Sequence, residues 1–229
     1  MQSKRLVIIL LSAVCGAAAG ALIPRFGPQL GRVPALMIDR PLLAHRWLFG
    51  AAVMGWVLFS AYWEAAARNA SAAQTSETRG SRSFHVLMTN VALLLIIAPL
   101  RALGRFLPVS VIIMSAGLAV EAAGLFLAIW ARRHLGRNWS GEITIKVQHE
   151  LVRSGPYRWL RHPIYTGILA MYVGTALVTG EWLAVAGLAM MGFAYWRKIH
   201  LEEANLNVAF GGDYEAYRRE TWALVPGLF

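Results

Sequence analysis

Apolar residues are grouped along this chain in long runs, separated by short stretches that hold most of the charged, proline and small polar residues. A run of about 20 apolar residues spans the hydrocarbon core of a bilayer as a helix. By that measure the sequence predicts six membrane-spanning helices, over residues 5–23, 44–64, 84–103, 109–131, 163–179 and 182–198. Loops are expected at 24–43, which holds four prolines, and at 65–83, which is rich in Ser, Thr and Ala. The pattern is typical of an all-α integral membrane protein.

The first apolar run has two interpretations. Lys4 and Arg5 precede it, as basic residues precede the apolar core of a signal peptide. Its apolar stretch is longer than the usual core of about 7–15 residues, which favours a retained helix.

Composition supports membrane insertion. The chain is 57% hydrophobic and 15% charged, whereas soluble domains carry about 25% charged residues. Its net charge of +10 comes from basic residues at the ends of apolar runs, which indicates membrane topology rather than nucleic-acid binding. With an inside N-terminus, 16 of the 22 Lys and Arg residues fall on the inner side. We therefore expect a multi-pass protein, placed in a bacterial inner membrane, with both termini cytoplasmic.

Metal and disulfide chemistry have little support. Cys15 is the one cysteine, and the six histidines are scattered without a close ligand spacing, so no metal site is expected. His45, His85, His134 and His200 are expected at loops or helix ends near the membrane interface.

The densest polar stretch is HELVRSGPYRWLRHPIYTG, residues 149–167, between two apolar runs. Polar side chains at a membrane-proximal helix start are costly unless they bind something or reach the headgroups. Proline disfavours helical geometry before it, so His162 should be extended and Pro163 should begin a helix. The amides of Ile164, Tyr165 and Thr166 would then be free to bind an anion.

A helical hairpin should bring a pair of carboxylates back to this segment. Residues 163–179 and 182–198 are joined only by the turn Thr179–Glu181, and they carry Gly167, Gly174, Gly187 and Gly192, which allow close helix packing. The second helix should continue through 197–220 with a break at Gly211-Gly212, which brings Glu202 toward His162. Lys198 and Glu202 share one helix face, with Glu203 beside them. Adjacent carboxylates favour a cationic ligand.

These motifs, H-x-L-V-x-x-G-P-Y, R-H-P-x-Y-x-G, the paired Glu and FGGDYEAYRRETWALVP, resemble the isoprenylcysteine carboxyl methyltransferase family and the related phospholipid methyltransferases. The resemblance covers residues 138–229. It implies S-adenosyl-L-methionine as the methyl donor, bound at the cytoplasmic face by His149, Leu151, Val152, Tyr157, His162, Pro163, Tyr165 and Glu202. We further expect ring faces of Tyr157 and Tyr165 to meet the donor's cation, and Arg161 to meet its carboxylate.

The resemblance also bears on the methyl acceptor, with Glu202, Lys198 and His162 as the expected catalytic residues. Lys198 stands where relatives that methylate prenylcysteine place an arginine, and lysine lacks the planar fork that binds a carboxylate. The expected reaction is carboxyl O-methylation of an isoprenoid-linked or lipid-like acceptor that enters from the bilayer. Its alternative is N-methylation of a phospholipid headgroup. A sterol-reductase-like NADPH enzyme and a non-enzymatic transporter or lipid scaffold are more distant alternatives.

The remaining expectations concern organisation. Residues 1–131 should form the N-terminal helices and 132–229 the methyltransferase core. Residues 222–226, the closing segment, should cover the cofactor, and Tyr214 and Tyr217 should pack the last helix. Glu121, in the middle of the fourth span, is either a substrate-path residue or, as we favour, a protonated or paired contact between helices.

Overall fold

The computed structural model describes residues 40–68, 78–98, 103–136, 139 and 151–227. Within these ranges the regular elements are helices, joined by short connections. Two isolated β-bridges pair residues outside the helices. They are α2 (Arg40–Ala67), α3 (Arg79–Ile97), α4 (Val111–Leu135), the 3₁₀ helix η4 (Gly155–Arg158), α5 (Pro163–Thr179), α6 (Trp182–Phe210) and α7 (Gly212–Glu220). The all-α prediction is confirmed, and the predicted helix at 5–23 lies outside the described residues.

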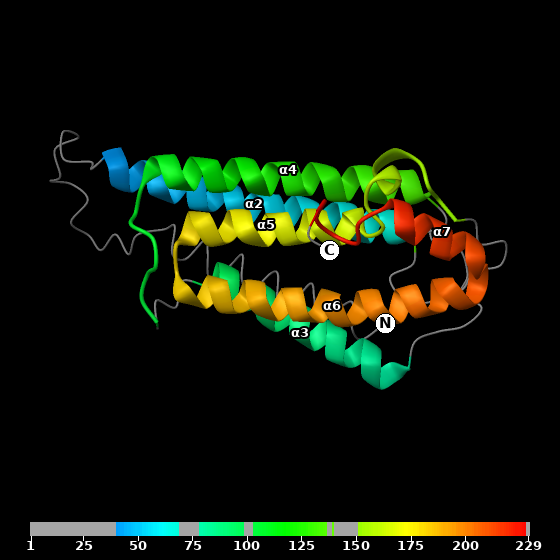
Figure 1. The fold of residues 1–229 in the computed structure, drawn as a ribbon. Helices are drawn as coiled ribbons and strands as arrows, with labels where there is room; N and C mark the ends of the chain where they lie inside the picture. Colours follow the sequence, from blue (N-terminus) through cyan, green and yellow to red (C-terminus); the bar gives the residue numbers. More distant parts are fainter. Residues whose placement is uncertain (1–39, 69–77, 99–102, 137–138, 140–150, 228–229) are drawn as a thin grey trace, which may run out of the picture.

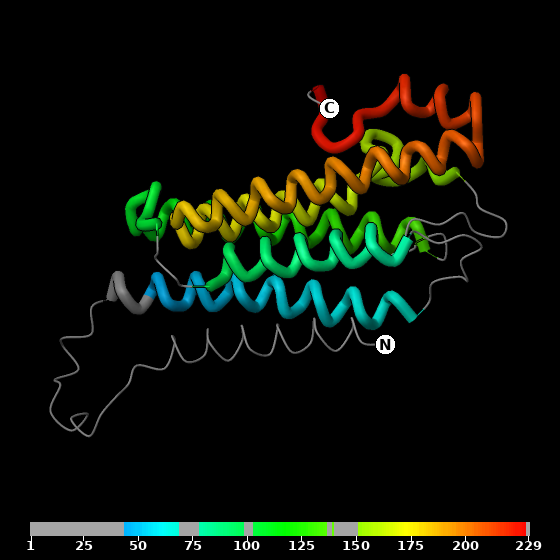
Figure 2. Tube along the Cα trace, turned by 90° about the horizontal axis from the view of Figure 1, so that it is seen from below, coloured from blue at the N-terminus to red at the C-terminus, as the bar shows by residue number. Residues whose placement is uncertain are grey.

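The long helices lie side by side in two groups. In Figure 1, α2, α4 and α5 form one group, and α3 runs along α6 below them. Figure 2 shows the same bundle from below, with the C-terminal residues beyond one face. Among the described residues, three helices are long and apolar enough to cross a membrane, Ala44–Ala67, Arg79–Ile97 and Val111–Leu135, and Pro163–Thr179 is a shorter apolar helix. The chain is an integral membrane protein.

Helix α3 differs from its predicted bounds of 84–103. The Thr78 hydroxyl accepts a hydrogen bond from the Ser81 amide (3.4 Å), which caps the helix five residues earlier than its apolar run begins. The helix ends at Ile97. The early start places His85 inside the helix, where it contacts α6, and not at the helix end.

Glycines allow α4 and α5 to pack backbone to backbone. A Cβ on Gly167 would lie 2.6 Å from the Gly124 carbonyl oxygen, and one on Gly174 would lie 2.5 Å from the Gly117 carbonyl oxygen. Such contacts leave no room for a side chain, and they confirm the predicted role of small residues on α5.

The glycines of α6 behave differently from one another. A Cβ on Gly187 would lie 2.8 Å from the Ala92 carbonyl oxygen of α3, so this glycine also permits close packing. The same prediction is wrong for Gly192, because nothing lies within 4 Å of a Cβ built there. Helix periodicity separates the two residues: five positions is about one and a half turns, so they face opposite sides.

The α5–α6 hairpin forms where it was predicted. Gly180 ends α5 in a left-handed conformation (φ +62°), which glycine adopts without strain. Its carbonyl accepts the amides of Phe106 (2.9 Å) and Leu107 (3.3 Å), so the turn is tied to the connection that precedes α4.

Glu121 is a paired contact between helices, as favoured from the sequence. It is 1% exposed, and its Oε2 lies 3.0 Å from the Thr175 hydroxyl of α5. That hydroxyl also accepts from Trp56 Nε1 (2.9 Å) and donates to the Met171 carbonyl (2.9 Å). A hydroxyl has one hydrogen, so a protonated Glu121 donating to Thr175 is the arrangement that satisfies all three bonds. The carboxyl group therefore joins α2, α4 and α5.

The last part of helix α6 reaches beyond the ends of α2 and α4, and the chain then reverses (Figure 1). Gly211 (φ +51°) ends the helix, and α7 turns back toward the start of α5 (Figure 1). The predicted break at Gly211-Gly212 is confirmed. The end of α4, η4, the start of α5 and α7 consequently lie at the same end of the bundle.

Candidate active site

The chain that leads into α5 is held by a glycine turn and by α7. Gly155 has φ +60°, and a Cβ there would meet the His134 ring at 2.7 Å, so the turn requires glycine. The Tyr217 hydroxyl of α7 donates to the Tyr157 carbonyl (2.7 Å). Tyr157 is 6% exposed, and burial, together with the nearby Tyr217 and Glu202, raises its pKa. The predicted packing role of Tyr217 is confirmed.

Helix α5 begins at Pro163, as predicted. His162 is the non-helical N-cap residue, although its ψ of 56° makes it less extended than expected. The Thr166 amide was expected to be free, and this is wrong, because it donates to the His162 carbonyl (3.1 Å) as the first bond of the helix. Only the backbone amides of α5 that come before Thr166 lie ahead of the first hydrogen bond of the helix.

The closing segment pairs with the residues that precede α5. The Arg161 amide donates to Trp222 (2.8 Å) and the His162 amide to Ala223 (3.0 Å). The Trp222 amide in turn donates to Trp159 (3.1 Å). The Thr166 hydroxyl donates to the Leu224 carbonyl (2.8 Å), so residues 222–226 lie across the start of α5.

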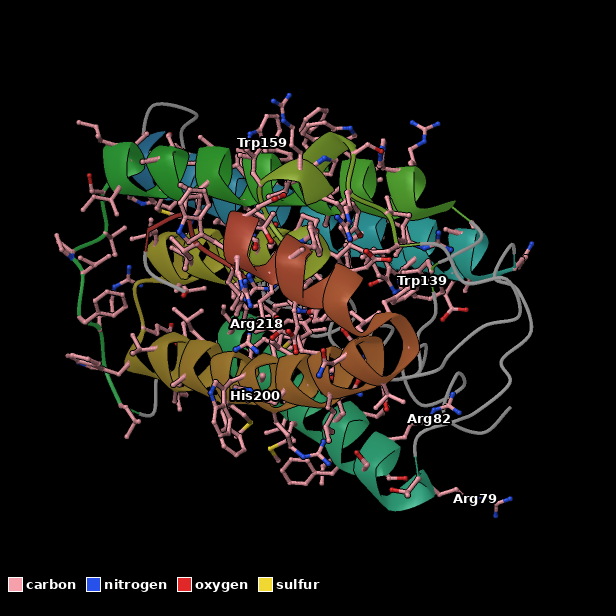
Figure 3. All side chains as sticks on the ribbon, turned by 45° about the vertical axis from the view of Figure 1, so that its right-hand side comes forward. Arg79, Arg82, Trp139, Trp159, His200 and Arg218 are labelled. Atoms are coloured by element: carbon pink, nitrogen blue, oxygen red, sulfur yellow. The ribbon has the colours of Figure 1, made fainter. Side chains whose placement is uncertain are left out.

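Glu203 is the better neutralised of the two carboxylates. Its Oε1 accepts from Arg161 Nε (2.8 Å) and lies 3.3 Å from His162 Nε2, and its Oε2 lies 3.8 Å from Arg218 Nε. Arg218 lies on α7, which faces α6 (Figure 3). Burial alone raises the pKa of Glu203, but the hydrogen bonds and charges of His162 and Arg161 outweigh it and lower this pKa to about 2. Glu203 is therefore ionised and used in internal pairing.

Glu202 has a different set of neighbours. Its Oε1 accepts from the Tyr165 hydroxyl (2.5 Å) and lies 4.0 Å from Lys198 Nζ, and its Oε2 lies 3.6 Å from His162 Nδ1. The predicted approach of Glu202 to His162 is thus present. Because its cationic neighbours are more distant than those of Glu203, Glu202 has more capacity to interact with a further cation.

The rings of His162, Tyr165 and Tyr195 form a row beside Glu202. His162 and Tyr165 stack with centroids 5.5 Å apart and planes 6° apart, and Tyr165 and Tyr195 stack at 4.4 Å and 16°. Lys198 Nζ lies 5.8 Å from the Tyr165 ring centroid. The face of Tyr165 that was expected to meet a cation already has protein partners.

Arg161 is likewise occupied. Besides Glu203, its guanidinium donates to the carbonyls of Arg218 (3.2 Å) and Thr221. Its side chain is 10% exposed. These contacts link the segment before α5 to both α6 and α7.

The other expected cofactor residues lie along the same segment. Pro163 is buried at the start of α5, and Leu151 and Val152 are half-buried, with Val152 packed against the main hydrophobic core. His149 lies outside the described residues.

Three residues near this cluster were not expected at the site from the sequence. Tyr195 on α6 belongs to the ring row, and His85 on α3 lies 5.8 Å from the Tyr195 ring. Tyr214 on α7 is 2% exposed and lies close to Glu203. Burial and the nearby Glu203 raise the pKa of Tyr214. A signal was present for Tyr195, which is three residues before Lys198 and so shares its helix face.

Fold and site together define a helical membrane protein with a polar cluster where a C-terminal hairpin meets its closing segment. Residues 112–213 match the family described as Phospholipid methyltransferase. The chain is 31% identical over 113 residues to a probable protein-S-isoprenylcysteine O-methyltransferase of Oryza sativa subsp. indica, which covers 48% of this chain and 59% of that protein. It is 28% identical over 115 residues to the Schizosaccharomyces pombe protein-S-isoprenylcysteine O-methyltransferase, covering 49% of each.

A solved structure shares the fold. It is described as the eukaryotic intramembrane Ras methyltransferase ICMT (isoprenylcysteine carboxyl methyltransferase), and it aligns with a TM-score of 0.58 and 19% identity, covering 83% of this chain and 69% of that one. The chain spans about half the length of the curated relatives it matches. The predicted resemblance is confirmed: residues 112–213 match the family described as Phospholipid methyltransferase, and the chain is similar to protein-S-isoprenylcysteine O-methyltransferases.

Proposed function

We propose that this protein is an S-adenosyl-L-methionine-dependent methyltransferase that acts on an amphiphilic acceptor at the membrane. The observation that carries the proposal is the position of Glu202. It lies beside His162 and Tyr165 at the start of α5, inside the region that matches methyltransferase relatives. A partly neutralised carboxylate at this place suits the ammonium or sulfonium of the methyl donor.

The residues present fit such a donor. Glu202 would meet the positive group of the donor. The half-buried Leu151 and Val152 would contact its apolar surface. The residues proposed to hold the donor are those expected from the sequence, His149, Leu151, Val152, Tyr157, His162, Pro163, Tyr165 and Glu202. Arg161 is better suited to position Glu203 and the closing segment than to contact the donor.

The protein's own contribution is alignment and exclusion of water. When bound, the donor supplies an electrophilic methyl group attached to a sulfonium. The ring row and the bonds of the closing segment hold His162 and Glu202 in fixed positions, which is the pre-organisation that a displacement needs. A carboxylate acceptor is already ionised and needs no base. An amine acceptor would lose a proton, and Glu202 is placed to receive it, since both nitrogens of His162 face carboxylates.

Two acceptor classes are consistent with this site. Carboxyl O-methylation of an isoprenylcysteine-type acceptor is supported by the names of the relatives, and Lys198, 8% exposed beside Glu202, would bind the acceptor carboxylate. N-methylation of a phospholipid headgroup is supported by the family that residues 112–213 match.

Orientation follows from the charge distribution. We propose that the site faces the cytoplasm of a bacterial inner membrane, with both termini on that side. The end of α4, the segment 151–161, α6 and α7 together carry nine of the 15 Lys and Arg residues of the described chain.

Methyl transfer in reconstituted vesicles tests the proposal. The purified protein is incubated with methyl-labelled S-adenosyl-L-methionine and either an N-acylated S-farnesylcysteine or phosphatidylethanolamine. A base-labile methyl ester identifies the first acceptor, and a methylated amine identifies the second. We expect Glu202→Gln to reduce transfer at least tenfold and Glu215→Gln, an exposed residue on α7, to leave it unchanged. Transfer to neither acceptor, nor to a lipid extract, would contradict the proposal.

A further inference from the structure

Arg132 is a buried cation that the proposed function does not use. It lies in the last turn of α4 and is 3% exposed. Within the described residues it forms no ion pair with a carboxylate, and its Nε atom is buried without a hydrogen-bond partner there. A buried charge without a counter-charge is costly, so a ligand that supplies the counter-charge gains affinity.

Two helix ends and an aromatic ring hold the Arg132 guanidinium in place. Nη1 donates to the Gly136 carbonyl at the end of α4 (3.0 Å), and Nη2 donates to the Ala66 carbonyl at the end of α2 (2.6 Å). The centroid of the Trp139 ring lies 4.1 Å from Cζ. These contacts fix the plane of the guanidinium and offset part of its charge, because helix ends and ring faces attract cations. They leave the Nε–H group without an acceptor.

The end of α4 that carries Arg132 packs on the segment proposed to hold the methyl donor. The ring of His134, two residues further along α4, stacks on the Tyr157 ring with centroids 6.5 Å apart and planes 24° apart. Burial raises the pKa of Tyr157, Glu202 adds to this effect, and Arg132 opposes it. Arg132 and Glu202, a cation and an anion, therefore both lie within electrostatic reach of the Tyr157 phenol.

Opposite charges around one ring suit a zwitterionic ligand. The proposed donor carries positive groups, for which Glu202 is the proposed partner, and one carboxylate. Arg161 was expected to meet that carboxylate, but its guanidinium is paired with Glu203 (2.8 Å) and donates to the Arg218 carbonyl (3.2 Å). Arg132 has no carboxylate among the described residues that would compete with the one of the donor.

We propose that Arg132 binds the carboxylate of S-adenosyl-L-methionine through its Nε–H group and its charge. The inference rests on the proposed function and assigns one group of the donor to one residue. Arg132 on α4 and Glu202 on α6 then hold opposite charges of the same ligand. Two fixed points of opposite sign determine the orientation of the donor as well as its position, which the alignment of its methyl group requires.

Equilibrium binding of two ligands that differ by one carboxylate tests this assignment. S-adenosylhomocysteine and its decarboxylated analogue are titrated into the full-length protein in mild detergent. We expect the wild type to bind S-adenosylhomocysteine at least about tenfold more tightly than the analogue. In Arg132→Gln, whose amide can still donate to a helix-end carbonyl, the preference should fall to about twofold or less. Arg133→Gln is the matched control, because Arg133 is exposed on the same helix, and it should keep the full preference.

The ratio of the two affinities separates carboxylate binding from a structural role of Arg132. If Arg132 only joined the ends of α2 and α4, its replacement would weaken both ligands equally and leave the ratio unchanged. An unchanged ratio in Arg132→Gln would overturn the inference and leave the proposed function intact. Equal binding of the two ligands by the wild-type protein would do the same, and this comparison holds even if Arg132→Gln does not fold. Binding of neither ligand by the wild type would overturn the proposed function, and the inference with it.

Discussion

Replacement of Arg161 should loosen the closing segment as well as remove an ion pair. Arg161 Nε donates to Glu203 (2.8 Å), and the same guanidinium donates to the carbonyls of Arg218 and Thr221. Both partners of the ion pair are mostly buried, at 10% and 14% exposure. Arg161→Ala therefore leaves the buried Glu203 carboxylate with fewer partners. It also removes the hydrogen bond to the Thr221 carbonyl, directly before the closing segment 222–226.

The expected loss of unfolding free energy in Arg161→Ala follows from the pKa of the Glu203 carboxyl group. Its pKa is lowered from 4.5 to about 2 against the effect of burial, and each unit corresponds to about 1.4 kcal/mol, so its pairing is favourable by on the order of 3 kcal/mol. A hydrogen bond to a charged group contributes about 1.5–3 kcal/mol. We expect Arg161→Ala to lower the free energy of unfolding by about 2–4 kcal/mol, and its coupling to Glu203→Gln in a double-mutant cycle to be about 1.5–3 kcal/mol.

Denaturant unfolding in mild detergent and hydrogen exchange measure the two effects. Exchange of the Trp222 amide, which donates to Trp159 (3.1 Å), should accelerate in Arg161→Ala. Arg158→Ala is the matched control, because Arg158 is exposed on η4. If Arg161→Ala cost no more than Arg158→Ala and left Trp222 exchange unchanged, this account of the closing segment would be refuted.

Three further predictions concern the helix packing, the buried carboxyl group and acid stability. Gly167→Ala should lower the free energy of unfolding by about 1–3 kcal/mol, because its Cβ would lie 2.6 Å from a backbone oxygen. Gly192→Ala has open space for its Cβ and should stabilise α6 by about 0.5–1 kcal/mol. Equal thermal shifts in the two variants would contradict this prediction. Glu121→Gln should keep the Tm of the wild type, since an amide donates to Thr175 as a protonated carboxyl does, whereas a large loss would mean that the ionised form is required. Glu203 has a lowered pKa in the folded state, so its stabilisation is present above pH 4.5 and is lost as the pH falls toward about 2. Unfolding measured across that range should show a steeper acid loss for the wild type than for Glu203→Gln, and parallel curves would argue against it.

The sequence predicted the C-terminal hairpin well because its signals are local. Pro163 begins α5 because proline suits the first position of a helix and keeps the residue before it non-helical. Gly180 and Gly211 end helices through their positive φ. The approach of Glu202 to His162 followed from hairpin topology alone, without any knowledge of side-chain contacts.

Long-range contacts were beyond the reach of these local signals. The start of α3 depended on a single Thr78 cap, and the error of five residues hid the position of His85. The Thr166 amide was misjudged because the helical ladder begins at the N-cap carbonyl, one residue before Pro163. The occupation of Arg161 by α7 could not be predicted, since it depends on how the chain returns after Gly211.

Equilibrium binding of labelled S-adenosyl-L-methionine to the purified protein is the direct test of the proposed methyl-donor site. We predict saturable binding that S-adenosylhomocysteine displaces and NADPH does not. It further predicts at least tenfold weaker binding in Glu202→Gln, which removes the charge opposite the donor's cation, and unchanged binding in Glu215→Gln. No saturable binding to the wild-type protein, or equal affinity in wild type and Glu202→Gln, would contradict the assignment of this site.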